Sequence, residues 1–427
     1  MGAVVIGFLI MIFLGMPVAF AIGLSGTLFF FVTPDLPYAI VVQKVVSSTQ
    51  SFTLLAIPLF IFAGNLMNNT GITEKLIKLA NVLTGHMYGN LGQVSTVLST
   101  LMGGVSGSAN ADAAMQCRVL GPSMNERGYK KGYSAAINGV TSLITATIPP
   151  SMGLIIYGSV GEVSIGRLFA AGIIPGLMMM VALMITVRYT ARKKGYAPES
   201  LKKPTLKEIG AASIDSIWAL MFPVILLVGI RLGILTPSES GAFAAVYAIF
   251  VGFFIYKKLN VKTFVKTVKD SIRDIGVIMI LVSLSGIFGY GIVYDSIPQK
   301  MAEFLIGVTS NPLILLFIVI LLLVFAGMFV ETTVVALLLT PILLPVVTRV
   351  GIDPVQFGVI MMTIVTMGIM TPPVGIALYT TSNIMGCKPE ETAKESVPFL
   401  IAIIAVVLVL ILWKDLVLFL PNLLFGA

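Results

Sequence analysis

Charged residues, histidine and cysteine are scarce in this chain of 427 residues. Asp, Glu, Lys and Arg make up 11% of the sequence, against about 25% in soluble domains, so ionised groups cannot cover a globular surface. One histidine, His86, and two cysteines, Cys117 and Cys387, exclude a Cys/His metal cluster and argue against a structural disulfide. No long polar stretch separates the apolar ones, which excludes a large soluble domain.

Apolar residues are abundant: they make up 57% of the sequence and give it a mean hydropathy of +1.02. A membrane-spanning helix needs about 20 such residues, whereas strands of a membrane β-barrel would alternate over about 10. The long apolar runs therefore predict an all-α polytopic membrane protein. The net charge of +8 is concentrated in loops beside these runs, as in cytoplasmic loops, so membrane lipid is an expected partner and nucleic acid is not.

Nine apolar runs are expected to cross the membrane: 4–31, 52–68, 132–160, 166–187, 217–234, 242–256, 275–295, 355–386 and 397–420. The first contains Pro17, which a membrane helix tolerates. Two further segments, 89–122 and 312–348, are apolar with polar residues at their centres, and these are expected to form re-entrant hairpins. Amphipathic patterns over 72–83 and 261–275 predict helices in the plane of the membrane interface.

Loops rich in Lys and Arg set the expected orientation. Basic residues cluster in 188–207 and 257–273, and Arg127, Lys130 and Lys131 follow the first hairpin. All of these segments can be cytoplasmic, as the positive-inside rule requires. Counting crossings from them places the N-terminus in the cytoplasm and the C-terminus in the periplasm. It also makes the two hairpins enter from opposite faces of the membrane.

An internal repeat supports this arrangement. Residues 223 positions apart match, including Gly104 with Gly327 and Pro149-Pro150 with Pro372-Pro373. A competing spacing of 263 aligns only one short segment. Inverted repeats are common in secondary transporters, where the binding site lies at mid-membrane between broken helices.

The centre of the first hairpin, 103–112, reads GGVSGSANAD. Its glycines let the backbone leave helical geometry, and Ser106, Ser108 or Asn110 can cap the helix that follows. The N–H groups and positive dipole end of such a helix suit a carboxylate. At the centre of the second hairpin, 327–333, threonines can take the capping role.

Each hairpin is followed by a helix that is expected to break at a double proline, within 145–151 and 368–373. Proline removes an amide donor and leaves carbonyl oxygens free inside the bilayer. Carbonyl and hydroxyl oxygens are hard ligands that suit Na⁺, as in other transporters with broken helices.

Asp112 and Glu331 are expected near the membrane interior, where an ionised carboxylate costs about 2.5–3.5 kcal/mol on insertion scales. Each either belongs to a functional site, or only caps a half-helix or pairs with a buried Lys or Arg. The sequence leaves both interpretations open.

Two polar segments have simpler interpretations. Asn65, Asn68 and Asn69 lie near a helix end, where a C-terminal cap and turn is favoured over a ligand site. The segment 236–241 is expected to be a helix start with Pro237 at the first position.

Five motifs carry a family resemblance: 58–64 (PLFIFAG), 103–112 (GGVSGSANAD), 235–241 (LTPSESG), 340–345 (TPILLP) and 371–375 (TPPVG). They are spread over most of the chain. With them the chain resembles the large membrane subunit of the tripartite ATP-independent periplasmic (TRAP) transporters, and most of all the sialic acid type.

The resemblance implies an inverted-repeat, elevator-type fold, in which a transport domain with both hairpins slides against a scaffold. It also implies two partners, a small four-helix TRAP membrane subunit and a periplasmic substrate-binding protein. The small subunit is expected as a separate chain, because no such region precedes Met1. The predicted division is scaffold 1–68, arm 72–86, transport half 89–160, scaffold 166–256 with a cytoplasmic basic loop 188–215, arm 260–274, transport half 275–386 and a C-terminal membrane helix 397–420.

The resemblance also implies site residues. One Na⁺ site would involve Ser106, Asn110, Thr145 and Thr147. A second would involve Gly327, Thr332, Gly368 and Met370. Substrate would meet Ser108, Asp112, Ser151 and Thr333.

The predicted function is Na⁺-coupled secondary active uptake of an organic acid, first of all sialic acid (N-acetylneuraminate), across the bacterial inner membrane. Alternatives are another TRAP substrate such as a C4-dicarboxylate, or a stand-alone Na⁺/carboxylate symporter without a binding protein. An enzyme is disfavoured because Asp112 and Glu331 lack a histidine or metal partner, and no organic cofactor is expected. A channel is disfavoured because the sequence has no ring of like charges.

Overall fold

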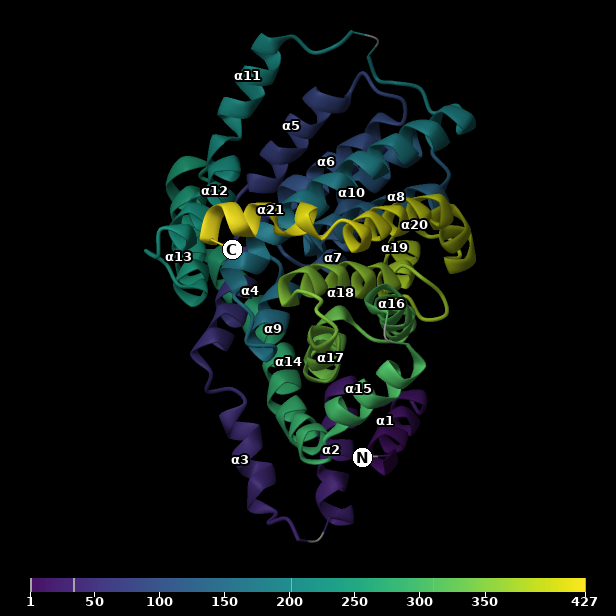
Figure 1. The fold of residues 1–427 in the computed structure, drawn as a ribbon. Helices are drawn as coiled ribbons and strands as arrows, with labels where there is room; N and C mark the ends of the chain where they lie inside the picture. Colours follow the sequence, from purple (N-terminus) through teal and green to yellow (C-terminus); the bar gives the residue numbers. More distant parts are fainter. Residues whose placement is uncertain (1, 34, 201, 310, 427) are drawn as a thin grey trace.

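The computed structural model describes residues 2–33, 35–200, 202–309 and 311–426. Within these ranges the chain forms helices and no strand (Figure 1), which confirms the all-α prediction. Residue 1, where the first predicted scaffold segment begins, and residue 201, within the predicted basic loop, lie outside the described residues.

The helices of the first half are α1 (Gly2–Phe13), α2 (Val18–Val32), α3 (Ala39–Ser47), η1 (Phe52–Leu55), α4 (Ala56–Asn68), α5 (Ile72–Thr84), α6 (Asn90–Gly103), α7 (Ala109–Glu126), α8 (Lys131–Thr141), η2 (Ser142–Ala146), α9 (Met152–Val160), α10 (Ile165–Lys194) and α11 (Leu206–Asp215). The remaining helices are α12 (Ile217–Arg231), α13 (Pro237–Phe250), η3 (Val251–Ile255), α14 (Val261–Tyr294), α15 (Ile297–Val308), α16 (Pro312–Phe329), α17 (Thr332–Arg349), α18 (Pro354–Gly368), α19 (Ile376–Met385), α20 (Pro389–Leu412) and α21 (Lys414–Phe425).

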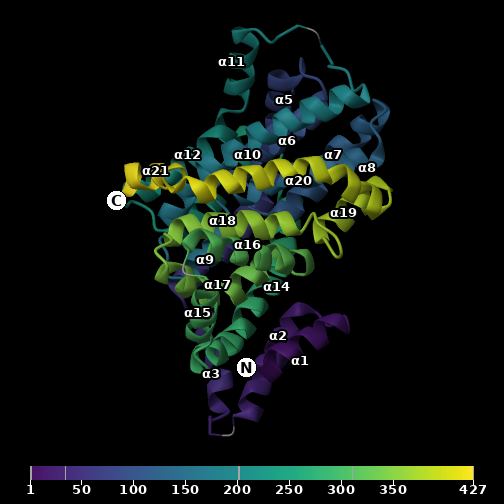
Figure 2. The same ribbon diagram turned by 45° about the vertical axis from the view of Figure 1, so that its right-hand side comes forward.

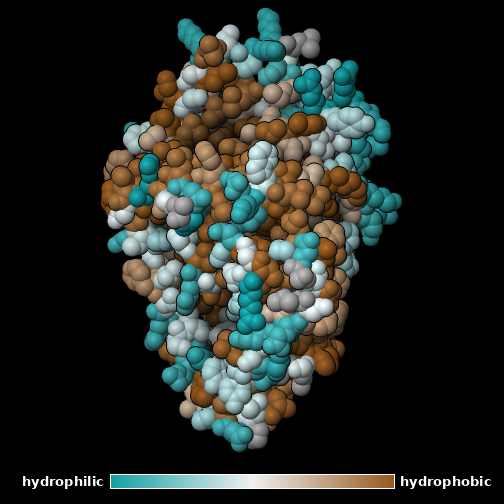
Figure 3. Space-filling view, in the orientation of Figure 1, coloured by the Kyte–Doolittle hydropathy of each residue, from teal (hydrophilic) through white to brown (hydrophobic). Residues whose placement is uncertain are grey.

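Six of the described helices are long and apolar enough to cross a membrane: α10, α13 with η3, α14, α16, α17 and α20. Two bent pairs, α3 with α4 and α11 with α12, raise the number of such segments to eight. The hydrophobic surface in Figure 3 is broad, and hydrophilic side chains gather along its right-hand edge, where α8 and α20 begin. A multi-pass membrane protein is confirmed, although fewer single helices qualify than the nine predicted crossings.

The predicted crossing at 4–31 is wrong, because this segment is a hairpin of α1 and α2. Gly7 packs against Leu28, so the two helices are antiparallel. Gly15 ends the first helix with a φ of +81°, and Pro17 stands directly before the second. The helices have 12 and 15 residues, or about 18 and 22 Å, and neither matches the ~30 Å of the hydrocarbon core.

This hairpin also changes the orientation count. The N-terminus lies on the same side as the end of α2, whereas one crossing would have separated them. The prediction of a cytoplasmic N-terminus was counted through that crossing and loses its support.

Further boundaries differ in the second half. The predicted arm 260–274 and crossing 275–295 form one unbroken helix, α14, of 34 residues. Neither a proline nor a helix cap lies at their predicted junction, and the helical pattern simply continues. The C-terminal helix predicted at 397–420 is α20 and a separate α21, because the chain breaks at Trp413.

Three short helices were not predicted: α3, α11 and α15. Helix α11 lies in the predicted basic loop and begins at a capping box, in which Thr205 and Glu208 bond each other's backbone N–H groups. The arm helix α5 was predicted, and its apolar side, including Ile72 and Leu76, is buried. Its Lys75 forms an ion pair with Asp215 of α11 at 2.7 Å.

Helix starts confirm the repeat of 223 residues. Ala109 and Thr332 begin α7 and α17, and Lys131 and Pro354 begin α8 and α18. The predicted helix breaks are also present, between η2 and α9 and between α18 and α19. Each contains a double proline with a cis peptide bond.

The long helices α10 and α20 lie side by side and show that the two halves run in opposite directions (Figures 1 and 2). The start of α8 lies at one end of this pair: the Tyr133 hydroxyl is 2.8 Å from the Thr190 hydroxyl of α10, and Gly132 packs against Glu391 of α20. At the other end, the Gln356 amide of α18 donates to the Leu410 carbonyl at 3.0 Å. The repeat is therefore inverted, as predicted.

Candidate functional site

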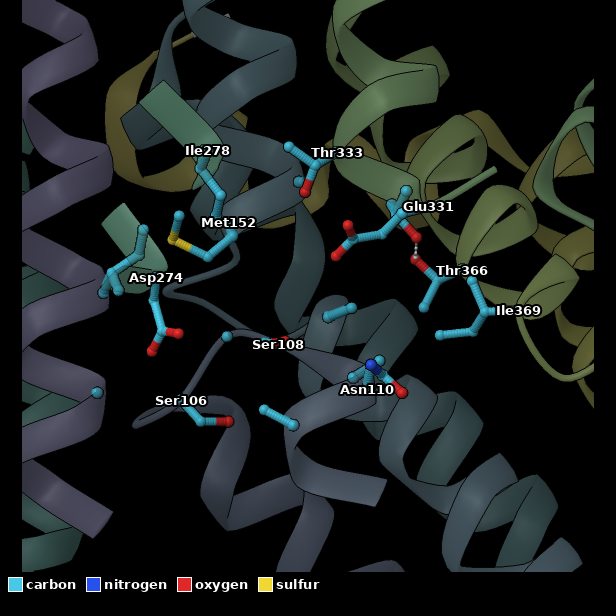
Figure 4. A pocket seen from close by; sticks show the side chains of 18 of the residues that line it. Ser106, Ser108, Asn110, Met152, Asp274, Ile278, Glu331, Thr333, Thr366 and Ile369 are labelled. Carbon is cyan, nitrogen blue, oxygen red and sulfur yellow. Dashed lines mark hydrogen bonds between the residues drawn. The ribbon is translucent and has the colours of Figure 1, made fainter. Parts of the chain in front are cut away.

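The tips of the two hairpins meet at one cavity of about 400 Å³. Figure 4 shows Ser106, Ser108 and Asn110 of the first hairpin on one side of it and Glu331 and Thr333 of the second on another. Helices α4 and α14, the first turn of α9, the end of η2 and the break between α18 and α19 supply the remaining walls. The predicted meeting of segments 103–112 and 327–333 is confirmed.

The first tip is held close to the helix break of its own half. Gly107 has a φ of +63°, and a Cβ atom there would lie 2.5 Å from the carbonyl oxygen of Pro150. The Met152 N–H donates to the Gly107 carbonyl at 3.4 Å. Both the backbone conformation and the close approach require glycine at this position.

Three polar side chains of this tip are free to bind a ligand. Ser108 is the N-cap residue of α7, yet its hydroxyl makes no capping bond and lines the cavity. The side-chain oxygens of Ser106 and Asn110 are buried and have no hydrogen-bond partner among the described residues. Together with the open N-terminus of α7, they form a polar surface at the cavity.

Asp112 lies behind this surface, because it is 1% exposed and is not among the residues that line the cavity. Its Oδ2 accepts hydrogen bonds from Ser99 (3.2 Å), Gln116 (2.7 Å) and Thr145 (2.8 Å), while its Oδ1 has no partner among the described residues. It makes no capping bond and no ion pair with a described residue. The structure therefore places Asp112 in a buried hydrogen-bond network.

Other residues of the first half also lie outside the cavity lining. Ser151 is fully buried and caps α9, where its hydroxyl accepts from the Leu154 N–H at 3.3 Å. Thr145 donates to Asp112, and the Thr147 hydroxyl lies 3.5 Å from the Leu143 carbonyl.

At the second tip, Thr332 and Thr333 line the cavity and the Thr332 hydroxyl is 3.4 Å from that of Thr366. Glu331 stands at the N-cap of α17 without a side-chain capping bond, and its carboxylate points into the cavity (Figure 4). Gly327 and Gly368 are in backbone contact, so neither position has room for a Cβ atom. Met370 is buried against Gly139 of the first half.

Comparison with known proteins identifies the family. Residues 5–416 match the family described as "Tripartite ATP-independent periplasmic transporter, DctM component". The chain belongs to this family. It is thus a TRAP transporter large permease, one component of a tripartite system, and the prediction of a transporter and not an enzyme is confirmed.

Relatives match the permease along its whole length. It is 36% identical over 423 residues to the sialic acid TRAP transporter large permease protein SiaM of Vibrio cholerae, covering 99% of this chain and 98% of SiaM. It is 32% identical over 436 residues to the C4-dicarboxylate TRAP transporter large permease protein DctM of Rhodobacter capsulatus, covering 99% of each. The crystal structure of the Alcanivorax borkumensis YdaH transporter shares the fold, with a TM-score of 0.67, 12% identity and 88% of each chain covered.

Four polar residues that line the cavity of the permease were not predicted as site residues: Asn65, Asn68, Asp274 and Thr366. Asn65 of α4 donates to the Asp274 carboxylate of α14 at 2.8 Å, and both face the cavity. Of the three neighbouring asparagines, Asn69 is the C-cap residue of α4 as predicted, while Asn68 also lines the cavity. The sequence held no signal for the pair of Asn65 and Asp274, because 209 positions separate the two residues.

The start of α13 agrees with its simple interpretation. Thr236 is the N-cap, Pro237 is at the first helical position and Glu239 completes a capping box. This segment of the permease is a helix start that lies away from the cavity.

Proposed function

We propose that the permease carries an organic acid across the bacterial inner membrane by Na⁺-coupled secondary active transport. The observation that carries this proposal is the single cavity formed by two oppositely directed hairpin tips. Its volume falls within the range of small-molecule sites, about 300–1,000 Å³. Sialic acid is the first candidate substrate and a C4-dicarboxylate the second, since relatives are named for each.

The substrate carboxylate binds at the N-terminus of α7. The first N–H groups of this helix have no partner within it, and its dipole favours an anion. The Ser108 hydroxyl, which makes no capping bond, adds a donor at the same place. Thr333 contacts the substrate from the second tip, whereas Asp112 and Ser151 act from behind the cavity wall.

Sodium ions are carried with the substrate. The unpartnered oxygens of Ser106 and Asn110 fit one Na⁺, with Thr145 and Thr147 of the nearby helix break as the further predicted contributors. Thr332, Gly327, Gly368 and Met370 belong to the second predicted ion position, where Gly368 lies directly against the Gly327 backbone. Hydroxyl, amide and carbonyl oxygens are the ligands that broken-helix transporters offer to Na⁺.

The movement proposed is of the elevator type. The hairpins and broken helices within 89–160 and 275–386 form the transport domain, with 1–68, 166–256 and 397–420 outside it. The continuous helix α14 crosses the boundary at 275 and links the two parts. Gly64 of α4 lies against the backbone of Val105 and Ser106. A Cβ atom at this position would lie 3.4 Å from the Val105 carbonyl oxygen, in ordinary van der Waals contact. A small residue at this crossing permits the tip to move past α4.

Partners and orientation complete the proposal. A small four-helix membrane subunit binds as a separate chain, and a periplasmic binding protein delivers the substrate. The base of the first hairpin, rich in Lys and Arg, lies in the cytoplasm. Helix α20 leads from that end to the opposite one, so the C-terminus is periplasmic.

The test is uptake into proteoliposomes that contain the permease, its small subunit and the binding protein. Accumulation of the acid should require an inward Na⁺ gradient, and Ser108→Ala should reduce it by about tenfold or more, because a donor to a charged group is lost. Ser200→Ala, the same change at an exposed position, is the control.

Three outcomes contradict the proposal. Accumulation on a proton gradient alone removes the sodium coupling. Unchanged uptake by Ser108→Ala removes the carboxylate assignment. Equal uptake by the permease without its partners favours the stand-alone symporter.

A further inference from the structure

The charges that line the cavity are all negative. Among its described lining residues are two carboxylates, Asp274 and Glu331, and no Lys, Arg or His. Neither carboxylate forms an ion pair with a described residue. This is an unusual lining for a site that receives an anion, and it limits which anions can enter.

The two carboxylates approach the cavity from different elements. Glu331 precedes α17 at the second hairpin tip and points into the open space between the tips (Figure 4). Asp274 extends from α14 on another side, where it accepts a hydrogen bond from Asn65 at 2.8 Å. Two carboxyl side chains thus face the part of the cavity away from the first tip.

The first tip offers an open helix N-terminus and a serine hydroxyl, and the donors elsewhere in the lining, such as Asn68, Thr333 and Thr366, are neutral side chains. The α7 N-terminus and the Ser108 hydroxyl provide for one carboxylate, as proposed above. A second carboxylate on the same ligand would lie against Glu331 or Asp274 with no cationic side chain to compensate. Repulsion between like charges in a largely desolvated site lowers the affinity for such a ligand by about tenfold or more.

We propose that the permease selects acids with a single negative charge whose other end carries hydrogen-bond donors, such as hydroxyl, amide N–H or ammonium groups. Glu331 is the specificity-determining residue, and Asp274 has a secondary part. This inference rests on the proposed function and names its substrate class. A C4-dicarboxylate, charged at both ends, is rejected.

The experiment is direct binding to the purified complex of permease and small subunit, without the binding protein, so that only the permease selects. Isothermal titration in Na⁺ buffer compares N-acetylneuraminate and gluconate, which are polyhydroxy monocarboxylates, with succinate. We expect at least one monocarboxylate to bind about tenfold or more tighter than succinate. Glu331→Gln should reduce this ratio to within about threefold by improving succinate binding.

Two further variants make the result decisive. Glu303→Gln, the same change on the exposed face of α15, should keep the wild-type ratio. Asp274→Asn should reduce the ratio by less than Glu331→Gln, and it tests the same idea if the Glu331 variant does not fold.

Several results would overturn the inference. Succinate binding as tight as that of both monocarboxylates would do so, and so would a Glu331→Gln variant that changes all three affinities by one common factor. If none of the three acids binds to the folded wild-type complex, the proposed function itself fails, and the inference fails with it.

Discussion

The two inverted halves differ in the interior beneath their hairpin tips. At equivalent positions of the repeat, buried polar residues of the first half have apolar counterparts in the second: Asp112 and Val335, Asn138 and Met361, Thr141 and Ile364. The helices that carry them begin at matching positions. Hence the helix arrangement does not by itself require polar residues at these sites.

The difference shows two ways of holding a re-entrant tip. In the first half, hydrogen bonds link α6, α7 and α8. The Ser95 hydroxyl of α6 is within 2.9 Å of Asn138 Oδ1 and within 2.7 Å of the Thr141 hydroxyl, both of α8. Gln116 of α7 donates to both Ser99 of α6 and Asp112. In the second half, apolar packing and the contact of Gly327 with Gly368 hold the helices together. Hydrogen-bonded networks specify one geometry, whereas apolar packing tolerates volume-conserving change.

The largest expected loss of stability comes from introducing a carboxylate into the second half, at the position equivalent to Asp112. Val335→Asp puts a charge at a position that is 3% exposed, where the counterparts of the Asp112 partners, Leu339 and Gly368, have no side-chain donors. An uncompensated buried charge costs about 3–5 kcal/mol, a large part of the stability of a folded protein. We expect little folded protein on size-exclusion chromatography in detergent.

Val335→Ala is the control for the lost volume and should yield folded protein. A Val335→Asp variant with the wild-type melting temperature would show that the second half can satisfy a carboxylate, and the contrast between the halves would be wrong.

An intermediate effect is expected from removing the carboxylate in the first half. Asp112→Ala removes the acceptor of three buried hydrogen bonds, and each buried group left without a partner costs about 1–3 kcal/mol. Asp112→Asn keeps an oxygen of the same shape and should cost clearly less. Thermal melting of the purified variants measures both, and equal losses for the two would contradict a structural role of the network.

The smallest effect is expected from trimming the apolar interior of the second half. Ile364→Val removes one methyl group at a position that is 2% exposed, at about 0.5–1.5 kcal/mol. Melting should shift slightly and Na⁺-driven uptake should remain at the wild-type rate. Loss of uptake without loss of stability would show that the second half is specified as narrowly as the first.

The sequence predicted those elements that local chemistry determines. Glycines and polar residues interrupt apolar runs at 103–112 and 327–333, and double prolines interrupt two more, so hairpins and broken helices could be located. Their approach to one cavity followed from the charge of the loops and from the repeat. The helix start at Pro237 was equally visible, because its signal lies within one helical turn.

The features that the sequence did not predict depend on contacts between distant segments. Gly15 and Pro17 are compatible with a kinked helix or with a hairpin, and only the packing of α1 on α2 decides between them. The bond between Asn65 and Asp274 joins residues 209 positions apart and has no pattern in the sequence. The same holds for Asp112, whose side chain turns toward α6 and away from the cavity.

Helix α14 continues without interruption for 34 residues, or about 51 Å, from Val261 to Tyr294. Its exposed beginning carries Lys262 and Lys266 beside Val261 and Val265, a pattern suited to lipid headgroups. Further along, the same rod presents Asp274 to the cavity and packs Phe288 against α2. One continuous helix therefore joins the exposed basic segment, the cavity wall and the packing against α2.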